Sequence, residues 1–381
     1  MNAPLSLSHT VRALSVEFAA RAKAHDLDAS FPTENFRDLQ ASGLLALAAP
    51  RALGGKGATL TQLAEVIGII GEGDPATGLV LIMQYIQHRA MGWEASSWPA
   101  PLARKLVQEA VDGVSLINAL RVEPDQGSPS RGGLPATIAR RTATGWSLSG
   151  HKVYCTGSPV LTWYSVWART DEDEPRVGNF LVAAGLPGIR IEETWDHLGL
   201  RASGSHDILF DAVALGTDAA LDLRTPKEWV GYDPGLFGDL AALVGALYTG
   251  VARSARNWVV EFLQQRKPSS LGAALSTLPR AQEIVGKIDE LLLVNDRLIA
   301  GVARDVDAGH GASMVDSGLV KSVTTNNAVE VVQLALSLSS NHGISRRNPL
   351  ERHLRDVLCG RIHTPQDDAV HIAAGRRALG V

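Results

Sequence analysis

The spacing of hydrophobic residues divides the chain into three blocks. From about residue 8 to 112, apolar positions recur every three or four residues, which predicts amphipathic helices. From about 114 to 220, apolar and polar residues alternate in short runs bounded by Gly, Asp and Pro, which predicts short antiparallel strands and tight turns. From about 234 the helical period returns and continues to the end. We therefore expect an α+β protein with a β-domain between two helical regions.

The last block contains three segments that are long enough to be bundle helices. These are Leu236–Gln265, Pro279–Asp307 and 317–340. Pro279 is a favoured residue in the first turn of a helix, and Ser317 is a plausible start signal. Long antiparallel helices with short connections favour a four-helix bundle. The expected domain limits are 1–113, 114–225 and 226–381.

Composition excludes several classes of protein. The net charge of −4 and the pI near 6.3 give no electrostatic footprint for nucleic acid or an anionic membrane. The longest apolar run, from Leu240 to Ala252, is too short to span a bilayer, and the first residues lack the pattern of a signal peptide. The two cysteines, Cys155 and Cys359, lie far apart without CxxC spacing, so we predict no disulfide and no metal site. We expect a cytoplasmic protein that binds neither nucleic acid nor membrane.

Residues 348–368 form the most informative segment. Charged residues at helical spacing predict structural ion pairs on a helix: Arg352, Arg355 and Asp356. The helical pattern breaks at Pro365, which lacks a backbone N–H and pushes Thr364 out of helical geometry. His363 is therefore predicted at a helix terminus or in the following loop. An imidazole there titrates near neutral pH and can face a cavity, so we expect the chemistry to be decided around it.

Three motifs occur in order along these blocks. They are Arg121-Val122-Glu123-Pro124-Asp125-Gln126-Gly127-Ser128, Gly150-His151-Lys152-Val153-Tyr154-Cys155-Thr156-Gly157, and Pro349-Leu350-Glu351-Arg352 followed by Arg355-Asp356. Together they resemble the acyl-CoA dehydrogenase superfamily over almost the whole chain. The resemblance implies an N-terminal helical domain, a middle antiparallel β-domain and a C-terminal four-helix bundle. It also implies a flavin between the last two, and usually a homotetramer.

The family has two branches, which need different catalytic groups. Its dehydrogenases remove an α-proton from an acyl thioester with a Glu while hydride passes to FAD. Its monooxygenases use reduced flavin from a separate reductase, form a flavin hydroperoxide with O₂ and oxygenate a small organic substrate. In this sequence the residue at the usual place of the Glu is Thr364, and the other place that the family uses falls on Leu240, next to Asp239.

The segment Gly360-Arg361-Ile362-His363 is similar to the monooxygenase pattern, and so is the loop from Trp195 to Ser205. We therefore predict a flavin-dependent monooxygenase. The alternative is an FAD-dependent acyl-CoA dehydrogenase with a non-standard base such as Asp239. A third possibility is a non-catalytic scaffold with this fold.

The resemblance assigns roles to three catalytic candidates. His363 would hydrogen-bond the substrate or the hydroperoxide, and Thr156 would donate its hydroxyl to the reactive nitrogen of the flavin. His88 lies on an amphipathic helix, where it either faces the flavin or is a satisfied core histidine. The alternative for Thr156 is a simple strand former, but the motif around it favours flavin contact. The residues expected to contact the flavin are Val122, Glu123, Gly127, Ser128, Tyr154, Cys155, Thr156, Gly157 and Ser205.

Two departures from the family pattern bear on the flavin. Ser339-Ser340 replaces a Gly-Gly pair at the adenosine part of FAD, and 266–270 reads Arg-Lys-Pro-Ser-Ser where the family has an FAD-gripping Arg-x-x-Phe-Gly. We therefore leave FMN and FAD open, and expect the flavin to be supplied reduced. The expected partners are a small-molecule substrate, O₂, a separate flavin reductase and further copies of the chain.

Overall fold

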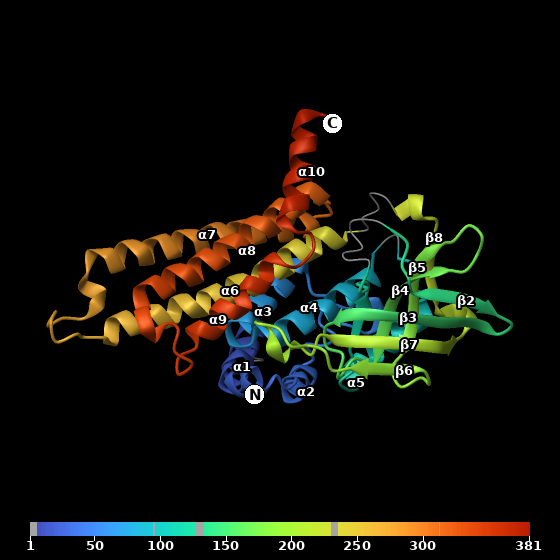
Figure 1. Cartoon of the computed structure of the whole chain (residues 1–381), viewed down its shortest axis with the longest axis horizontal. Coiled ribbons are helices and arrows are strands. Elements are labelled where there is room, and N and C mark those ends of the chain that lie inside the picture. Colours follow the sequence, from blue (N-terminus) through green and yellow to red (C-terminus); the bar gives the residue numbers. More distant parts are fainter. Residues whose placement is uncertain (1–5, 94–95, 126–132, 230–234, 312) are drawn as a thin grey trace.

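The computed structural model describes residues 6–93, 96–125, 133–229, 235–311 and 313–381. The molecule is elongated, with a long helical bundle at one end and a β-sheet at the other (Figure 1). The N-terminal helices lie against one side of this body, next to both parts. The α+β fold class is confirmed.

Five α-helices form the N-terminal region. They are α1 (Leu7–Asp28), α2 (Thr33–Ala41), α3 (Leu60–Gly73), α4 (Pro75–Ala90) and α5 (Ala100–Asp112). Helix α4 begins where Asp74 accepts hydrogen bonds from the backbone N–H groups of Ala76 and Thr77, with Pro75 in the first turn. Most of α4 is buried, and it contacts both α6 of the bundle and β1 of the sheet. This helix therefore lies at the junction of all three regions.

The middle region is one sheet of eight strands. They are β1 (Ile117–Leu120), β2 (Ile138–Thr142), β3 (Gly145–Cys155), β4 (Trp163–Thr170), β5 (Val177–Ala183), β6 (Ile189–Glu192), β7 (His206–Leu215) and β8 (Ala220–Arg224). The strand order is β6-β7-β3-β2-β4-β5-β8, and β1 also pairs with β4. Most pairs are antiparallel, but β1 and β2 both run parallel to β4. The sheet is therefore mixed and not purely antiparallel as expected. The sequence could not distinguish the two, because side chains alternate in the same way in both kinds of pairing.

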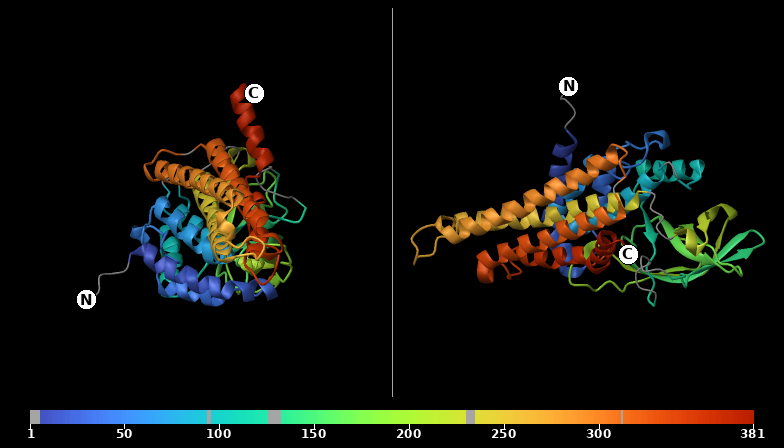
Figure 2. Two further views of the ribbon diagram at one scale, coloured as in Figure 1. Left: turned by 90° about the vertical axis from the view of Figure 1, so that its left-hand side faces the viewer. Right: turned by 90° about the horizontal axis from the view of Figure 1, so that it is seen from above.

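The C-terminal region contains three long helices and two short ones. They are α6 (Leu236–Gln265), α7 (Pro279–Asp307), α8 (Met314–Ser339), α9 (Leu350–Leu358) and α10 (Asp367–Leu379). Helix α8 starts earlier than Ser317, because the side chain of Ser313 accepts a hydrogen bond from the N–H of Asp316 and caps the helix there. Helix α10 packs on α8 and projects from the bundle (Figures 1 and 2).

Helix α6 is the core of the bundle. By length and composition it is the one described helix apolar enough to cross a membrane, but 78% of its apolar window is buried inside the protein. It packs against α3, α4, α7, α8 and α9, so its apolar residues are covered on several sides. Burial of this kind is what a core helix requires.

A buried ion pair anchors the start of the β-domain. Lys152 on β3 donates from Nζ to Oε1 of Glu123 at 2.7 Å, and both residues are almost fully buried. Glu123 also accepts hydrogen bonds from the backbone N–H groups of Ala136 and Thr137 and from the Thr137 hydroxyl. These donors compensate the carboxylate for the loss of water, so the pair ties β3 to the segment before β2.

Replacing Lys152→Met is expected to destabilise the protein by about 3–5 kcal/mol, because the Glu123 carboxylate would stay buried without its counterion. The denaturant midpoint of unfolding measures this. The control is Arg176→Met, which breaks the exposed pair with Glu172 and is expected to cost less than about 1 kcal/mol. Equal losses in the two variants would contradict the anchoring role of Lys152.

Candidate functional site

Hydrogen bonds join α4, β1 and the end of β3 at one place. Gln84 on α4 accepts from the N–H of Ile117 on β1 at 2.7 Å. The amide of Asn118, the next residue of β1, donates to the backbone oxygen of Thr156 at 3.0 Å. Both contacts are buried, so they hold Thr156 in a fixed position next to α4.

Gly157 allows a close approach between the end of β3 and α4. Its φ is +82°, and an added Cβ would lie 3.0 Å from Cγ1 of Val80 on α4. A larger residue would face both a strained backbone and a crowded contact. The Thr156-Gly157 pair therefore brings the hydroxyl of residue 156 close to the helix that carries His88.

Three hydroxyls form a buried chain beside this contact. Oγ1 of Thr156 lies 3.0 Å from Oγ of Ser205, which lies 2.8 Å from Oγ of Ser203. Three hydroxyl groups carry three hydrogens, and two internal hydrogen bonds use only two of them. One hydrogen therefore remains to be donated to an acceptor outside the chain. The sequence had pointed to Thr156 and Ser205, but not to Ser203.

An exposed group of aromatic rings lies at the same end of β3. Tyr154 is 56% exposed and has a φ of +58°. Its ring meets Trp195 and His197 edge-on, and these two rings are themselves stacked with centroids 3.7 Å apart. Large exposed aromatic surfaces of this kind gain free energy when a planar, apolar ring covers them.

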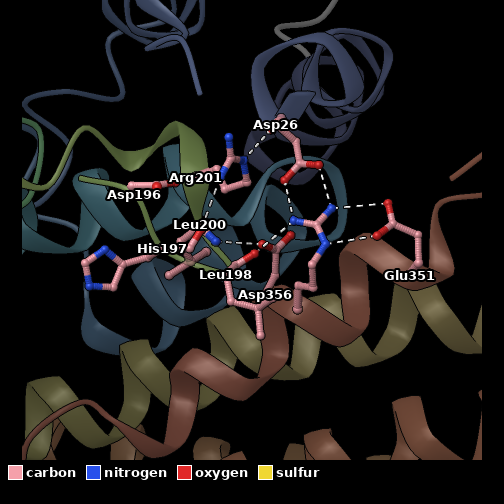
Figure 3. A network of polar contacts seen from close by, with 9 residues as sticks. Asp26, Asp196, His197, Leu198, Leu200, Arg201, Glu351 and Asp356 are labelled. Carbon is pink, nitrogen blue, oxygen red and sulfur yellow. Dashed lines mark hydrogen bonds and ion pairs between the residues drawn. The ribbon is translucent and has the colours of Figure 1, made fainter. Parts of the chain in front are cut away.

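Arg355 on α9 is the centre of a network that holds the loop after β6. Its partners Asp26, Leu198 and Glu351 are labelled in Figure 3. Its guanidinium donates twice to the carboxylate of Asp26 on α1, at 2.8 and 2.6 Å. It also contacts Glu351 one turn earlier and the backbone oxygen of Leu198. Two-point pairing with a carboxylate fixes both partners in orientation. The network thus connects the first helix, α9 and the loop that leads to Ser203 and Ser205.

Asp356 contacts the same loop. Its Oδ1 accepts from the N–H of Leu200 at 2.7 Å, and burial raises its pKa to about 7. Gly199 is needed here because a Cβ would collide with the backbone oxygen of Arg355. The expectation of ion pairs within the helix holds for Arg355 and Glu351, but Asp356 hydrogen-bonds to the loop instead. Sequence spacing could not reveal these long-range partners.

His363 lies in the loop between the 3-10 turn Cys359–Arg361 and α10, as its place before Pro365 predicted. Its Nε2 is 2.7 Å from the hydroxyl of Tyr248 on α6. Tyr248 is fully buried, which raises the pKa of its phenol. Burial and the nearby charge of Lys321 lower the pKa of His363 to about 4. At neutral pH the pair therefore consists of a neutral imidazole and a neutral phenol. Tyr248 was not anticipated from the sequence.

His88 lies inside the protein rather than at its surface. Its Nε2 is 3.1 Å from Nε2 of Gln84, which can donate to it. Its Nδ1 has no hydrogen-bond partner among the described residues, and burial lowers its pKa to about 4. Within the described chain no hydrogen bond joins His88, Thr156 and His363, so each is held by different neighbours.

The proposed alternative base, Asp239, lies on α6 and is fully buried. Its Oδ2 accepts from Nε of Arg89 on α4 at 2.6 Å. The adjacent guanidinium supplies the counterion that a buried carboxylate requires. Asp239 is thus arranged as the ion-pair partner that holds α4 against α6.

The remaining flavin candidates differ in what they can offer. The Glu123 carboxylate is fully occupied by Lys152 and neighbouring donors, and the backbone oxygen of Val122 accepts from Val153. Cys155 is buried, which raises the pKa of its thiol and makes it a small strand residue rather than a nucleophile. Gly127 and Ser128 lie outside the described residues.

Comparison with known proteins gives consistent matches along the chain. Family models described as the N-terminal, middle and C-terminal domains of acyl-CoA dehydrogenase match residues 5–93, 121–213 and 242–367. The chain is 31% identical to the putative acyl-CoA dehydrogenase YdbM of Bacillus subtilis, over 93% of this chain and 91% of that protein.

Other similar proteins carry different names. The chain is 29% identical to L-evernosamine nitrososynthase of a Micromonospora strain, over 95% of this chain and 87% of that protein. It also matches the X-ray structure of KijD3 in complex with FMN and dTDP-3-amino-2,3,6-trideoxy-4-keto-3-methyl-D-glucose. That match has a TM-score of 0.78 and 27% identity, and covers 99% of this chain and 95% of the other. The similar proteins therefore include both dehydrogenases and nitrososynthases.

The buried His88 generates a prediction on acid stability. Its folded-state pKa of about 4 lies below the usual value, so the unfolded chain takes up a proton first as pH falls. Stability from this group is present above about pH 6.5 and is lost toward pH 4. In His88→Gln, the loss of unfolding free energy between pH 7 and pH 5 is expected to be about 2 kcal/mol smaller than in the wild type. Denaturant titrations at both pH values measure this, with His9→Gln, an exposed histidine, as control. An unchanged pH dependence in His88→Gln would refute it.

Proposed function

The chain belongs to the acyl-CoA dehydrogenase family, and from this premise we propose that it is a flavin-dependent monooxygenase of that family. The observation that carries the proposal is the state of the two possible bases. Residue 364 is a Thr, and Asp239 is paired with Arg89. In contrast, the His363–Tyr248 pair offers a neutral imidazole where the family places its chemistry. A site with this equipment is better suited to donating hydrogen bonds than to removing a weakly acidic proton.

Two features of the chain fit a flavin. The exposed ring of Tyr154 and the half-buried ring of Trp195 offer a surface for a planar ring system, and the hydroxyl chain that includes Thr156 has one hydrogen left for an acceptor. We propose that Tyr154, Thr156, Gly157 and Ser205 hold the isoalloxazine end. When bound in its reduced form, the flavin supplies the electrons that activate O₂ for transfer of one oxygen atom.

The chain's own residues would then control protons. Tyr248 can donate to Nε2 of His363, which leaves the imidazole hydrogen on Nδ1 for the substrate or the oxygen being transferred. The buried hydroxyl chain would keep water out and donate from Thr156. His88 has an Nδ1 without a partner in the described structure, so we propose it as a second contact in the same site.

We propose FMN rather than FAD. Ser339 is buried and donates its hydroxyl back to the carbonyl oxygens of Ala335 and Leu336. Ser340 has a φ of +49°, a conformation that glycine adopts without strain. The Gly-Gly surface that would accept the adenosine part of FAD is thus replaced by two side chains. A weakly retained flavin fits supply by a separate reductase in the cytoplasm, and we expect a homotetramer.

The first substrate class to test is an amine on a nucleotide-linked sugar. The nitrososynthases named among the relatives are 27–29% identical to this chain, and KijD3 was crystallised with such a compound and FMN. The alternative is an acyl-CoA dehydrogenase, which the 31% identity to YdbM favours. In that case Asp239 would have to leave Arg89 and act as the base.

The first experiment separates these functions. The protein is mixed anaerobically with reduced FMN and an amino-sugar nucleotide, and then with isotopically labelled O₂. We expect oxidised flavin to appear more slowly than with free reduced FMN, and labelled oxygen to enter the product. Bleaching of bound FAD by an acyl-CoA in the absence of oxygen would support the dehydrogenase instead. No flavin binding at all would support a scaffold.

The second experiment tests His363. In His363→Gln, the rate of oxygen transfer is expected to fall on the order of 100-fold because the imidazole proton is lost, while reduced FMN still binds. The matched control is His310→Gln, which changes an exposed histidine after α7. An unchanged rate in His363→Gln would contradict the proposed role.

A further inference from the structure

Lys321 is a buried cation that the proposed chemistry does not use. It lies on α8 with 1% of its surface exposed. Its Nζ has no hydrogen-bond partner among the residues that the structure describes. Burying an ammonium without a partner is costly, and buried lysines are normally paired. A residue kept in such a position invites a functional explanation.

The contacts of α8 locate Lys321 beneath the His363 loop. Three residues before it, an added Cβ on Gly318 would lie 3.7 Å from Cγ of Pro365. Four residues after it, Cβ of Thr325 would lie 3.3 Å from a Cβ on Gly360. Residues spaced three and four apart share one face of a helix. Lys321 therefore lies on the face of α8 that the loop from 360 to 365 covers.

His363 lies between those two contact points in the chain, and the neighbouring elements carry two charged side chains and one phenol. Asp367 at the start of α10 accepts from Nδ2 of Asn326 at 2.6 Å, and exposed Arg361 donates to Oδ1 of the same Asn326 at 2.8 Å. Tyr248 approaches from α6 as a neutral phenol.

Two further titratable groups act on Tyr248. Asp356 and Cys359 influence Tyr248 rather than the imidazole. No described carboxylate forms an ion pair with His363, whereas Lys321 acts on it with a positive charge. The electrostatic balance at the imidazole is therefore set by burial and by one lysine.

We propose that Lys321 is a positioning residue that keeps the imidazole of His363 neutral further into the acid range, so that its hydrogen stays on Nδ1 there. A second positive charge next to an unpaired ammonium is unfavourable, so protonation of the imidazole is suppressed. A protonated imidazole would place a hydrogen on Nε2, facing the Tyr248 oxygen. Tyr248 would then lose the acceptor for its own hydrogen. A neutral ring accepts a hydrogen bond from Tyr248 at Nε2, and its Nδ1–H remains available to a different acceptor.

The shifted pKa values agree with this arrangement. Burial lowers the pKa of Lys321 to about 8 against the opposing charge of Asp367, so the side chain is still mostly charged at neutral pH. The pKa of His363 is about 4, lowered by burial first and by Lys321 second. The proposal deepens the proposed function, since it assumes that His363 takes part in the reaction, but its electrostatic part holds without any flavin.

The test is a histidine titration by NMR on the full chain without flavin, with ¹⁵N-labelled histidine and His363→Gln to assign the signal. In the wild type, His363 is expected to stay neutral to about pH 4, with its hydrogen on Nδ1. In Lys321→Met its proton affinity is expected to rise about tenfold. The control is Lys287→Met, which removes the same charge from an exposed pair with Glu330. An unchanged titration of His363 in Lys321→Met overturns the proposal.

Folding of the variant is itself informative. Met has a similar length and no charge, so Lys321→Met is expected to keep or raise the denaturant midpoint. A large fall in the midpoint, in both Lys321→Met and Lys321→Gln, would mean that the ammonium has a stabilising partner, which overturns the proposal.

Activity distinguishes this proposal from the proposed function. If the protein transfers oxygen, the acid side of its pH profile is expected to move upward in Lys321→Met, in parallel with the NMR titration. If the protein transfers no oxygen but the NMR shift occurs, the proposed function fails and the electrostatic role of Lys321 stands. If oxygen transfer occurs and the titration is unchanged, the role of Lys321 fails alone.

Discussion

The pairing of Arg355 with Asp26 is the interaction on which the rest of the site depends. It joins residues 329 positions apart, from the first helix and from α9, through two charge-assisted hydrogen bonds. The same guanidinium holds the backbone oxygen of Leu198. The loop that continues to Ser203 and Ser205 is therefore attached to the helical part of the protein, not only to the sheet. Together with the contact from the N–H of Leu200 to Asp356, this attachment fixes the hydroxyl chain relative to the bundle.

Buried charges fall into two groups in this protein. The pairs Glu123–Lys152 and Arg89–Asp239 are closed, because each charge has an opposite partner within 2.7 Å. Such pairs fix the orientation of the elements that carry them. Lys321 is different, since its buried Nζ has no hydrogen-bond partner among the described residues. The charge of Asp367 acts on Lys321 but forms no ion pair with it among the described contacts, and a buried ammonium without a hydrogen-bond partner is costly, so it is most readily explained where a reaction benefits from it.

The fold was largely predictable because its signals are local. The bounds of α6 and α7 agree with the helical period, and Pro279 marks the start of α7 as expected. The start of α8 was placed too late, because Ser313 lies outside the periodic pattern that indicated Ser317. Parallel pairing of β1 and β2 with β4 was missed for a different reason: strand direction depends on connections, and side-chain alternation carries no information on it.

The candidate site was predictable only in part, because motifs name residues but not their partners. The position of His363 followed from Pro365, but its partner Tyr248 is 115 residues away. Glu123 stands in a motif that suggests flavin contact, yet its carboxylate is used by Lys152. Long-range pairing of this kind depends on the packing of whole elements.

The ion pair of Asp239 links the fold to the choice of reaction. A carboxylate that removes an α-proton must be free to change its charge, whereas one that holds α4 against α6 must keep it. Asp239 accepts a hydrogen bond from Arg89 and balances its positive charge, so using Asp239 as a base would weaken the junction that also carries His88 and Gln84. The neutral His363–Tyr248 pair, in contrast, is not an ion pair that holds α4 against α6. Proton transfer at that pair would leave the packing of α4 and α6 intact, which is the physical reason why we propose that the chemistry takes place there.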